Sequence, residues 1–337
     1  MIEHRFARGV ALGRTRVLLA ALASCVSACA QLRGDVDAAG TVPVEAGSFL
    51  MGSTLDDRAM AIELAHASSG RVTPEATLSV KREFRRTKVP VGAFRIMVRP
   101  VTQRDYFAYV LATGAPEPYV DPNSWARLAL GHDYREVEQS LWRGDGPRPG
   151  RMDHPVVLVS QHEAAAYCQW WGAHHNAVGQ LPSEVQWEKA ARGEDGQRYP
   201  WGDDYHPGKL NAAEAGPGTT VAVGSYPEGA SPYGALDMAG NVFEWTRTRD
   251  GEAQYIVKGG AWNSDGASAR AAARHARPQA LRHISVGFRC VLNPVEDKAA
   301  SARGRRGNRR SARSGSATKR VRQGGAKGEA GSRRRGD

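Results

Sequence analysis

The residues of this sequence with the widest chemical repertoire are its four cysteines. Cys168 and Cys290 lie in the body of the chain, and a cysteine thiolate can bind a soft metal, act as a nucleophile or enter a disulfide. In an oxidising compartment an even pair is usually a disulfide. This bridge would close a loop of more than a hundred residues, which the chain-entropy account values at roughly 4–5 kcal/mol. We therefore expect Cys168 and Cys290 to be structural if the chain is exported.

The N-terminal end indicates export. Arginines precede a short apolar stretch over residues 17–28, which is too short to span a bilayer. The segments Leu-Ala-Ser-Cys25 and Val-Ser-Ala-Cys29 both resemble the bacterial lipobox, whose cysteine is lipidated and becomes the new N-terminus. A plain signal peptide cut near residue 28 or 30, with secretion to the periplasm, is the alternative. We expect a signal over 1–29 and a lipid anchor at Cys29, which leaves the longer apolar run, or else at Cys25. The protein would then face the periplasm of a bacterial envelope and touch a membrane through this anchor.

The excess positive charge lies at the C-terminal end. Residues 298–337 hold 14 Lys or Arg and 2 Asp or Glu, so the remainder of this chain of net charge +11 carries −1. A nucleic-acid-binding domain would carry its basic patch on the folded surface, and an exported protein rarely meets nucleic acid. Residues 295–337 are almost free of apolar side chains, which predicts a disordered basic tail that contacts anionic envelope polymers or lipid headgroups. A solvated extension without a function is the alternative.

Three segments of the body share a pattern typical of a short helix. Each has a hydroxyl residue, an acid or amide three positions later, an apolar run and a glycine. The hydroxyl caps the N3 amide while the N3 side chain reaches back, and glycine adopts the left-handed conformation that ends the helix. The segments start at Thr102, Ser160 and Ser183 and end at Gly114, Gly172 and Gly193.

The other segments predict small strands and loops. After a linker over 30–41, residues 41–52 predict a strand pair with a tight glycine turn, and residues 89–98 alternate like one strand. Residues 53–81 are polar and predict a surface excursion with a short helix near 59–67. Residues 116–154 are rich in Pro, Gly and Asp, and predict an inserted loop.

A series of motifs covers residues 42–294. They include Gly47-Ser-Phe-Leu-Met-Gly52, Leu181-Pro-Ser-Glu-Val-Gln-Trp-Glu-Lys-Ala-Ala-Arg192, Asp237-Met-Ala-Gly-Asn-Val-Phe-Glu-Trp245, Lys258-Gly-Gly-Ala-Trp262 and Val286-Gly-Phe-Arg-Cys290. In order and spacing they resemble the formylglycine-generating enzyme (sulfatase-modifying factor) domain family. The resemblance implies an α+β, C-type-lectin-like fold with little regular secondary structure. It also implies a disulfide between Cys168 and Cys290, which match the paired cysteines of the family members that bear one.

The resemblance further implies bound calcium. In the family one site uses a side chain, two backbone carbonyls and a glutamate of the Gly-Asn-x-x-Glu-Trp region, an all-oxygen set that suits this hard cation. The matching groups are Asp237, the carbonyls of Gly240 and Val242, and Glu244. Capping of local turns by the two carboxylates is the alternative.

A second calcium site of the family has a weaker counterpart. It starts at an Asn-x pair that matches Asn211 and Ala212. The family's aspartate falls at about Ala215, which has no donor, although Glu214 is adjacent. This second site is therefore in doubt already in the sequence.

The copper site is where this sequence departs from the family. The two cysteines that hold copper and carry out the oxidation fall at Ser264 and Ala269. Serine is a poor ligand for Cu(I), which prefers thiolates, and alanine offers no donor atom. We therefore expect neither copper nor formylglycine-generating oxidase activity. The vacated site leaves a candidate groove formed by Trp262, Asn263, Ser264 and His275.

The histidines offer no replacement for this metal centre. His162, His174 and His175 lie on or just past one predicted helix and form no facial triad with a carboxylate. His275 and His283 flank the vacated site, where we expect them to be solvated surface residues.

Two functions are consistent with this sequence. One is an exported, lipid-anchored envelope protein whose domain is a non-catalytic binding or scaffold module for another envelope protein or a saccharide. In architecture it is similar to lipoproteins of gliding-motility and type IX secretion machinery, and to the vertebrate paralogue without the cysteines. The alternative is a periplasmic oxidoreductase of the same superfamily, of siderophore-maturation or nitrite-reductase-accessory type, whose chemistry does not depend on the copper cysteine pair.

Overall fold

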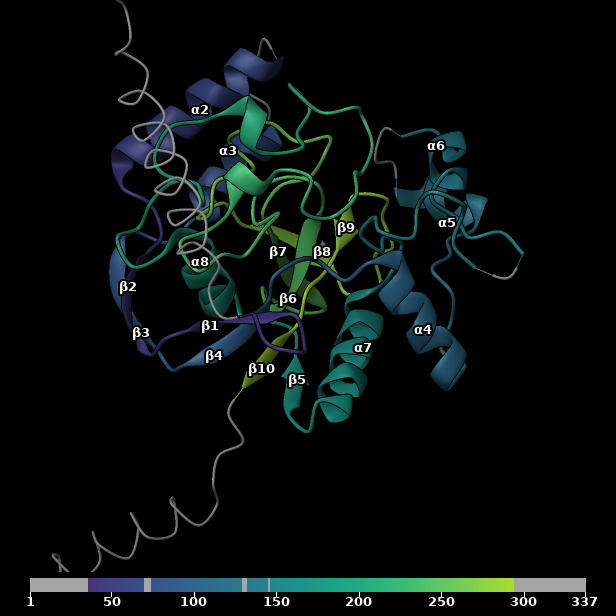
Figure 1. Ribbon diagram of the computed structural model, residues 1–337. Helices are drawn as coiled ribbons and strands as arrows, with labels where there is room; N and C mark the ends of the chain where they lie inside the picture. Colours follow the sequence, from purple (N-terminus) through teal and green to yellow (C-terminus); the bar gives the residue numbers. More distant parts are fainter. Residues whose placement is uncertain (1–35, 70–73, 129–131, 145, 294–337) are drawn as a thin grey trace, which may run out of the picture. The chain divides into compact units, whose positions relative to one another are not determined.

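The structure, a computed structural model, describes residues 36–293 apart from 70–73, 129–131 and 145. Its short strands form three separate sheets, and the two-stranded one lies at the edge of the domain (Figure 1). The first sheet has the order β1-β4-β10-β5, the second pairs β2 with β3, and the third has the order β8-β7-β6-β9. The strands are β1 (Thr41–Val44), β2 (Gly47–Met51), β3 (Thr87–Val91), β4 (Phe94–Met97), β5 (Val178–Gln180), β6 (Phe243–Arg249), β7 (Gln254–Lys258), β8 (His275–Pro278), β9 (Val286–Gly287) and β10 (Val291–Asn293). This arrangement confirms the predicted α+β fold.

Short helices surround the sheets. They are α2 (Leu55–Ser69), α3 (Pro74–Arg82), α4 (Gln103–Thr113), α5 (Pro122–Leu128), α6 (Tyr134–Glu138), α7 (Gln161–His174) and α8 (Glu184–Arg192), with 3-10 turns η1 (Pro207–Lys209) and η2 (Pro227–Gly229). Between α8 and β6 the chain is otherwise irregular. Within the part of the chain that the structure describes, every helix is too short or too polar to span a lipid bilayer.

The predicted helix starts are confirmed. Thr102, Ser160 and Ser183 each accept a hydrogen bond from the N3 backbone amide, and each N3 side chain accepts one from the cap residue's own amide. Gly114 (φ 68°, ψ 20°) ends α4 in the left-handed conformation, as expected. Gly193 ends α8 as expected, with a positive φ of 74°, but its ψ of −160° lies outside the left-handed helical region.

The predicted end of α7 at Gly172 is wrong, because the helix continues to His174. A Cβ atom at Gly172 would lie 2.2 Å from the backbone nitrogen of Gly179 in β5. Glycine is needed here for the close approach of helix and strand, and not to stop the helix.

The strand predictions need two corrections. β1 and β2 do not pair with each other: β1 is antiparallel to β4, and β2 is antiparallel to β3. The single strand expected over 89–98 is two strands interrupted near Gly92, and the two belong to different sheets. Local alternation shows which residues are extended but contains no information about the partner strand.

Two predicted excursions are helical and packed. Residues 55–69 and 74–82 form α2 and α3, where Ala61, Ala65 and Val80 are buried against Ala267. The insertion over 116–154 contains α5 and α6, and its tryptophans Trp125 and Trp142 are buried.

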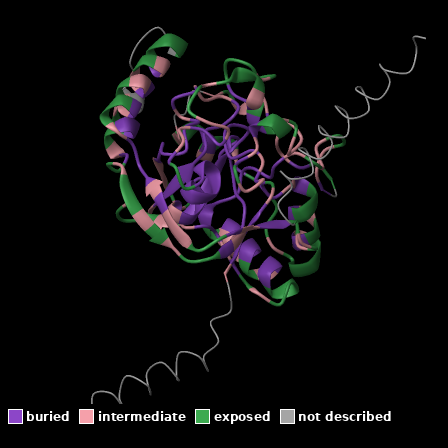
Figure 2. Cartoon of the chain, turned by 60° about the vertical axis from the view of Figure 1, so that its left-hand side comes forward, coloured by how far each residue is buried: buried purple, intermediate pink, exposed green. Residues whose placement is uncertain are grey.

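Buried residues gather in the middle of the domain, while exposed ones line the outer faces of the helices (Figure 2). The largest cluster contains Tyr106, Tyr167, Trp245 and Phe288 together with both cysteines. A second cluster surrounds Trp187 of α8. Large aromatic side chains thus supply much of the apolar area that these short elements bury.

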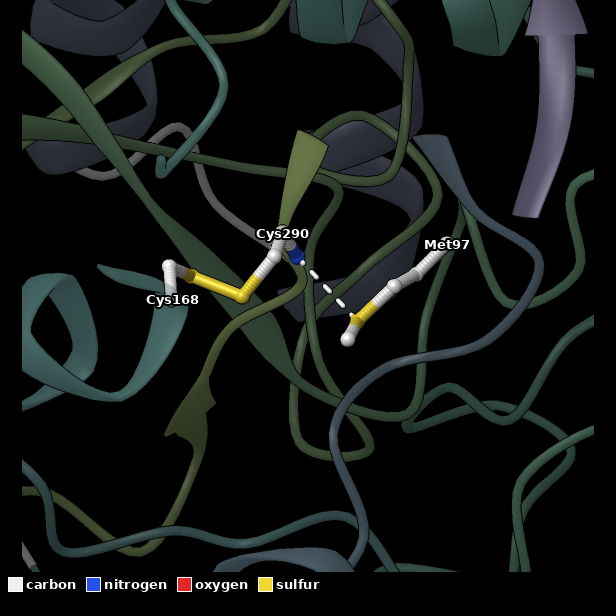
Figure 3. The surroundings of a disulfide bond; sticks show 3 residues. All are labelled: Met97, Cys168 and Cys290. Atoms are coloured by element: carbon white, nitrogen blue, oxygen red, sulfur yellow. Dashed lines mark hydrogen bonds between the residues drawn. A yellow bond between two sulfur atoms is a disulfide. The ribbon is translucent and has the colours of Figure 1, made fainter. Parts of the chain in front are cut away.

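A disulfide joins Cys168 of α7 to Cys290, which immediately precedes β10 (Figure 3). The bridge closes a sequence separation of 122 residues, and both cysteines are fully buried. The backbone amide of Cys290 also donates to the sulfur of Met97 at 3.3 Å. The predicted pairing is therefore confirmed.

Replacing both cysteines by serine should lower the free energy of unfolding by about 2–5 kcal/mol, because the unfolded chain loses its longest constraint. Urea unfolding of wild type and of the Cys168→Ser/Cys290→Ser variant measures this change. A reducing agent should destabilise the wild type to a similar extent and leave the variant unaffected. Equal midpoints for reduced and oxidised wild type would contradict the prediction.

Candidate functional site

The Gly-Asn-Val-Phe-Glu-Trp segment is held by a buried ion pair between Glu244 and Arg289. The guanidinium donates to both carboxylate oxygens, each at 2.7 Å, and the indole N–H of Trp187 donates to one of them at 2.7 Å. All three residues are fully buried. Glu244 therefore has strong donors at both of its oxygens.

Asp237 lies near this pair in a left-handed backbone conformation (φ 54°). It is buried, and its one described hydrogen-bond donor is the amide of Gly224 at 2.6 Å. Burial raises the pKa of Asp237 to about 6, with a further contribution from Glu244, although the Gly224 amide and Arg289 oppose the shift. A buried carboxylate beside a second one is a suitable oxygen ligand for a cation.

The first predicted calcium set therefore fits in part. Asp237 has lone pairs to offer, whereas the Glu244 carboxylate is already engaged by Arg289 and Trp187. The carbonyls of Gly240 and Val242 belong to the same turn, in which Gly240 has φ 78°. Calcium at these four residues remains a prediction.

The second predicted set has one free acceptor. The side-chain oxygen of Asn211 is buried without a hydrogen-bond partner among the described residues. The carbonyl of Ala212 accepts from Gly216 at 2.8 Å. Glu214 is turned to the hydroxyl of Tyr205 at 2.9 Å and does not supply the missing carboxylate. Nowhere among the described residues do three His, Cys, Asp or Glu side chains gather in a way that could hold a metal ion.

The positions of the two absent cysteines are occupied by ordinary packing and hydrogen bonding. The hydroxyl of Ser264 accepts from the amide of Ala261 at 3.1 Å. Ala269 is 1% exposed and packs in an apolar cluster with Tyr199 and Leu210. Neither position offers a soft donor atom.

The insertion brings an unexpected histidine to the rim of this vacated site. His132 contacts Asn263 at 2.9 Å through Nε2 and Glu136 at 2.8 Å through Nδ1. Its ring lies 5.8 Å from that of Trp262. His132 and Glu136 could not be predicted from the sequence, because nothing in their spacing indicates which part of the domain the insertion contacts.

The solvated surface position expected for His283 is wrong. His283 is 7% exposed and stacks on Trp125 of the insertion with 5.0 Å between ring centroids. Its Nδ1 lies 2.7 Å from the hydroxyl of Ser285, and its Nε2 is buried without a partner among the described residues. The insertion covers this residue, which the sequence alone places next to an open site.

His275 is only partly exposed as well, and it is not joined to the Trp262 rim. Its ring lies 5.0 Å from Phe243, and its Nε2 is 3.4 Å from the hydroxyl of Ser79 in α3. Three further histidines are exposed on or just after α7: His162, His174 and His175. The structure thus brings Trp262, Asn263 and Ser264 together with His132, and places His275 among other neighbours.

The free energy of unfolding should decrease as the pH is lowered from about 6.5 to about 3, because His283 stays neutral in the folded protein. Burial, together with His132 and Arg277, lowers the pKa of its imidazole to about 3, whereas the unfolded chain is protonated below about 6.5. The unfolded state then binds the extra proton, so acid favours unfolding across this window.

In chemical denaturation, the free energy of unfolding of a His283→Phe variant should depend less steeply on pH, by the slope that corresponds to about one bound proton. His162→Phe, at an exposed position on α7, is the matched control and should keep the wild-type slope. Indistinguishable slopes for wild type and His283→Phe would show that His283 is not the titrating group.

Several known proteins are similar to this chain in sequence. The chain is 31% identical over 251 residues to the inactive C-alpha-formylglycine-generating enzyme 2 of Mus musculus, covering 62% of this chain and 79% of that protein. It is 29% identical over 305 residues to the formylglycine-generating enzyme of Mycobacterium tuberculosis, covering 70% and 99%. A hercynine oxygenase of Mycolicibacterium smegmatis is 34% identical over 172 residues, which span only 38% of that protein.

The solved structure of PvdO from Pseudomonas aeruginosa shares the fold, with a TM-score of 0.53 and 21% identity over 75% of this chain and 94% of that one. The sequence profile described as sulfatase-modifying factor enzyme 1-like domain matches residues 29–294. The chain belongs to this family of sulfatase-modifying factor enzyme 1-like domains.

Proposed function

We propose that this chain is an exported, lipid-anchored envelope protein whose sulfatase-modifying factor domain is a non-catalytic binding or scaffold module. The main support for the proposal is that serine and alanine stand at the two positions at which the family has its copper cysteines. Ser264 uses its hydroxyl to fix a turn, and Ala269 is packed among apolar side chains. Restoring the chemistry would need two thiolates at these positions.

Similarity to a mouse protein named as an inactive formylglycine-generating enzyme supports the proposal. The insertion supports it too, because His132 contacts Asn263 next to Ser264. A side chain of the domain itself thus lies at the rim of the vacated site.

The second candidate is an oxidoreductase of the same superfamily that works without the copper cysteines. The observation in its favour is the pairing of His132 with Glu136 at 2.8 Å. A carboxylate that orients one ring nitrogen while the other faces a groove is the arrangement of many acid–base catalysts. In this structure, however, the second ring nitrogen of His132, Nε2, is already in contact with the side chain of Asn263. We therefore favour the binding module.

Calcium, the lipid anchor and the basic tail are further parts of the proposal. Calcium would be held by Asp237 with Glu244 and neighbouring carbonyls, and would neutralise a buried carboxylate. Cys29, Cys25 and the tail over 295–337 lie outside the described residues. We propose that the anchor tethers the domain and that the tail contacts anionic polymers or lipid headgroups.

A sulfatase-type Cys-x-Pro-x-Arg peptide should remain unchanged when it is incubated with this protein, with or without copper. The expectation follows from the absence of thiolates at Ser264 and Ala269. Mass spectrometry of the peptide measures the conversion, with the formylglycine-generating enzyme of Mycobacterium tuberculosis as the positive control. Conversion of the cysteine to formylglycine by the wild-type chain would overturn the proposed function.

Calcium should raise the melting temperature of the wild type relative to the same protein in chelator. A ligand that binds only the native state adds about 2.7 kcal/mol when its concentration is 100 times Kd. Asp237→Asn should abolish the calcium response, whereas Asp56→Asn, at an exposed position, should retain it. Coincident melting curves of the wild type with calcium and with chelator would rule out this site.

A further inference from the structure

A cavity of about 550 Å³ lies away from the groove that the sequence predicts. It is bordered by the first residues of the described chain, by the start of α4 and by the second half of α7. Its volume falls in the range of small-molecule sites. The lining residues that carry the argument are Arg99, Asp105, Tyr167, Trp170, Trp171 and His175.

One wall of the cavity is aromatic. Tyr167, Trp170 and Trp171 lie three and four positions apart on α7, so they share one face of the helix. The phenol hydroxyl and both indole N–H groups make no hydrogen bond to the described residues. They are not among the buried polar atoms left without a partner, so each of them is accessible from outside the core. Such groups normally find a partner when the ring is buried. A ligand with oxygen atoms along its edge could provide these partners.

Charged side chains of both signs also line the cavity. Arg99 is exposed and makes no ion pair or hydrogen bond within the part of the chain that the structure describes. One oxygen of Asp105 accepts from Thr102, and its other oxygen has no described partner. Arg104 and Asp153 form an ion pair at 3.0 Å. The two guanidinium groups and two carboxylates leave this lining without a net charge, so it does not favour a ligand of either sign and offers both donors and acceptors to a neutral one.

The cavity is also firmly built. Met97, one of its lining residues, accepts a hydrogen bond from the amide of Cys290 (Figure 3). Cys290 is bonded to Cys168 on the helix that carries the aromatic wall. The disulfide thus fixes two parts of the cavity lining relative to each other, so less conformational entropy is lost when a ligand binds.

We propose that this cavity binds one ring of an uncharged saccharide. A sugar ring has a C–H face that packs on aromatic side chains, and hydroxyls that both donate and accept. Those hydroxyls can accept from Arg99 and the indole N–H groups, and donate to Asp105. A peptide that binds by strand addition would need a free strand edge, which the cavity does not offer, because its one strand, β4, lies between β1 and β10.

This inference rests on the proposed function, because it gives the binding module a ligand class. The two can still fail separately. Oxidation of the Cys-x-Pro-x-Arg peptide would overturn the non-catalytic module whatever the cavity binds, and failure of every saccharide to bind would overturn only the inference about the cavity.

The experiment uses a panel of trisaccharides with one variant that fills the cavity. Neutral probes are trimers of glucose, galactose, rhamnose and N-acetylglucosamine, and charged probes are trimers of glucosamine and galacturonic acid. Ala108 is an exposed residue of α4 that lines the cavity, so Ala108→Trp should block it without disturbing the core. Leu111→Trp, on the same helix at a position that is 71% exposed, is the matched control.

Saturation-transfer NMR and calorimetry should show binding of at least one neutral trimer with a Kd of about 1 mM or below. Ala108→Trp should weaken this binding at least tenfold and Leu111→Trp should leave it unchanged. Arg99→Ala should weaken it severalfold, and Arg135→Ala, an exposed arginine outside the cavity, should not. Binding of charged trimers alone, absence of binding by all neutral trimers, or equal binding by Ala108→Trp and wild type would each overturn the proposal.

Discussion

The arginine of the Gly-Phe-Arg-Cys motif holds together parts of the chain that no sheet connects. Arg289 donates to both oxygens of Glu244 and to the backbone carbonyls of Met97, Val98 and Leu236. Arg289 thereby connects β6 to the end of β4 and to the irregular segment that precedes β6. Removing one partner of such a buried pair would leave an uncompensated charge, at a cost of about 3–5 kcal/mol. A fold with small sheets depends on this kind of polar junction for its geometry.

Helix α8 shows the same principle. Its Glu184, Glu188, Lys189 and Arg192 are all buried, although a helix so rich in charge would ordinarily lie at the surface. The carboxylate of Glu188 forms ion pairs with Arg192 at 2.8 Å and with Lys258 at 3.0 Å. Burial alone would raise the pKa of Glu188, but the attraction of Lys258 and Arg192 is stronger, so the pKa is lowered. Because any other arrangement would leave a buried ion without a partner, the network favours a single packing of α8 against β7.

The features that the sequence predicted correctly are those set by neighbouring residues. The helix starts at Thr102, Ser160 and Ser183 depend on side chains three positions apart, and the disulfide follows from family motifs and the number of cysteines. The features that it missed depend on distant partners. His283 is buried only because Trp125, from an insertion far earlier in the chain, stacks on it.

The candidate sites follow the same division between local and distant information. The spacing of Tyr167, Trp170 and Trp171 along one helix face is visible in the sequence. Their meeting with Arg99 and Asp105 is not, because it depends on how α7 packs beside α4. The absence of thiolates at Ser264 and Ala269 could likewise be read directly, whereas the contact of His132 with Asn263 could not.

The position of the disulfide has a mechanical consequence. β10 has three residues, and it is the last strand before the chain continues beyond the described part. A strand so short would peel easily from β4 and β5 under tension on its C-terminal end. Cys290 lies immediately before it and is covalently attached to α7. A pulling force between the two ends of the domain could therefore strip β10, but would then pass through the sulfur–sulfur bond directly to α7. The chain between Cys168 and Cys290 would be shielded from that force.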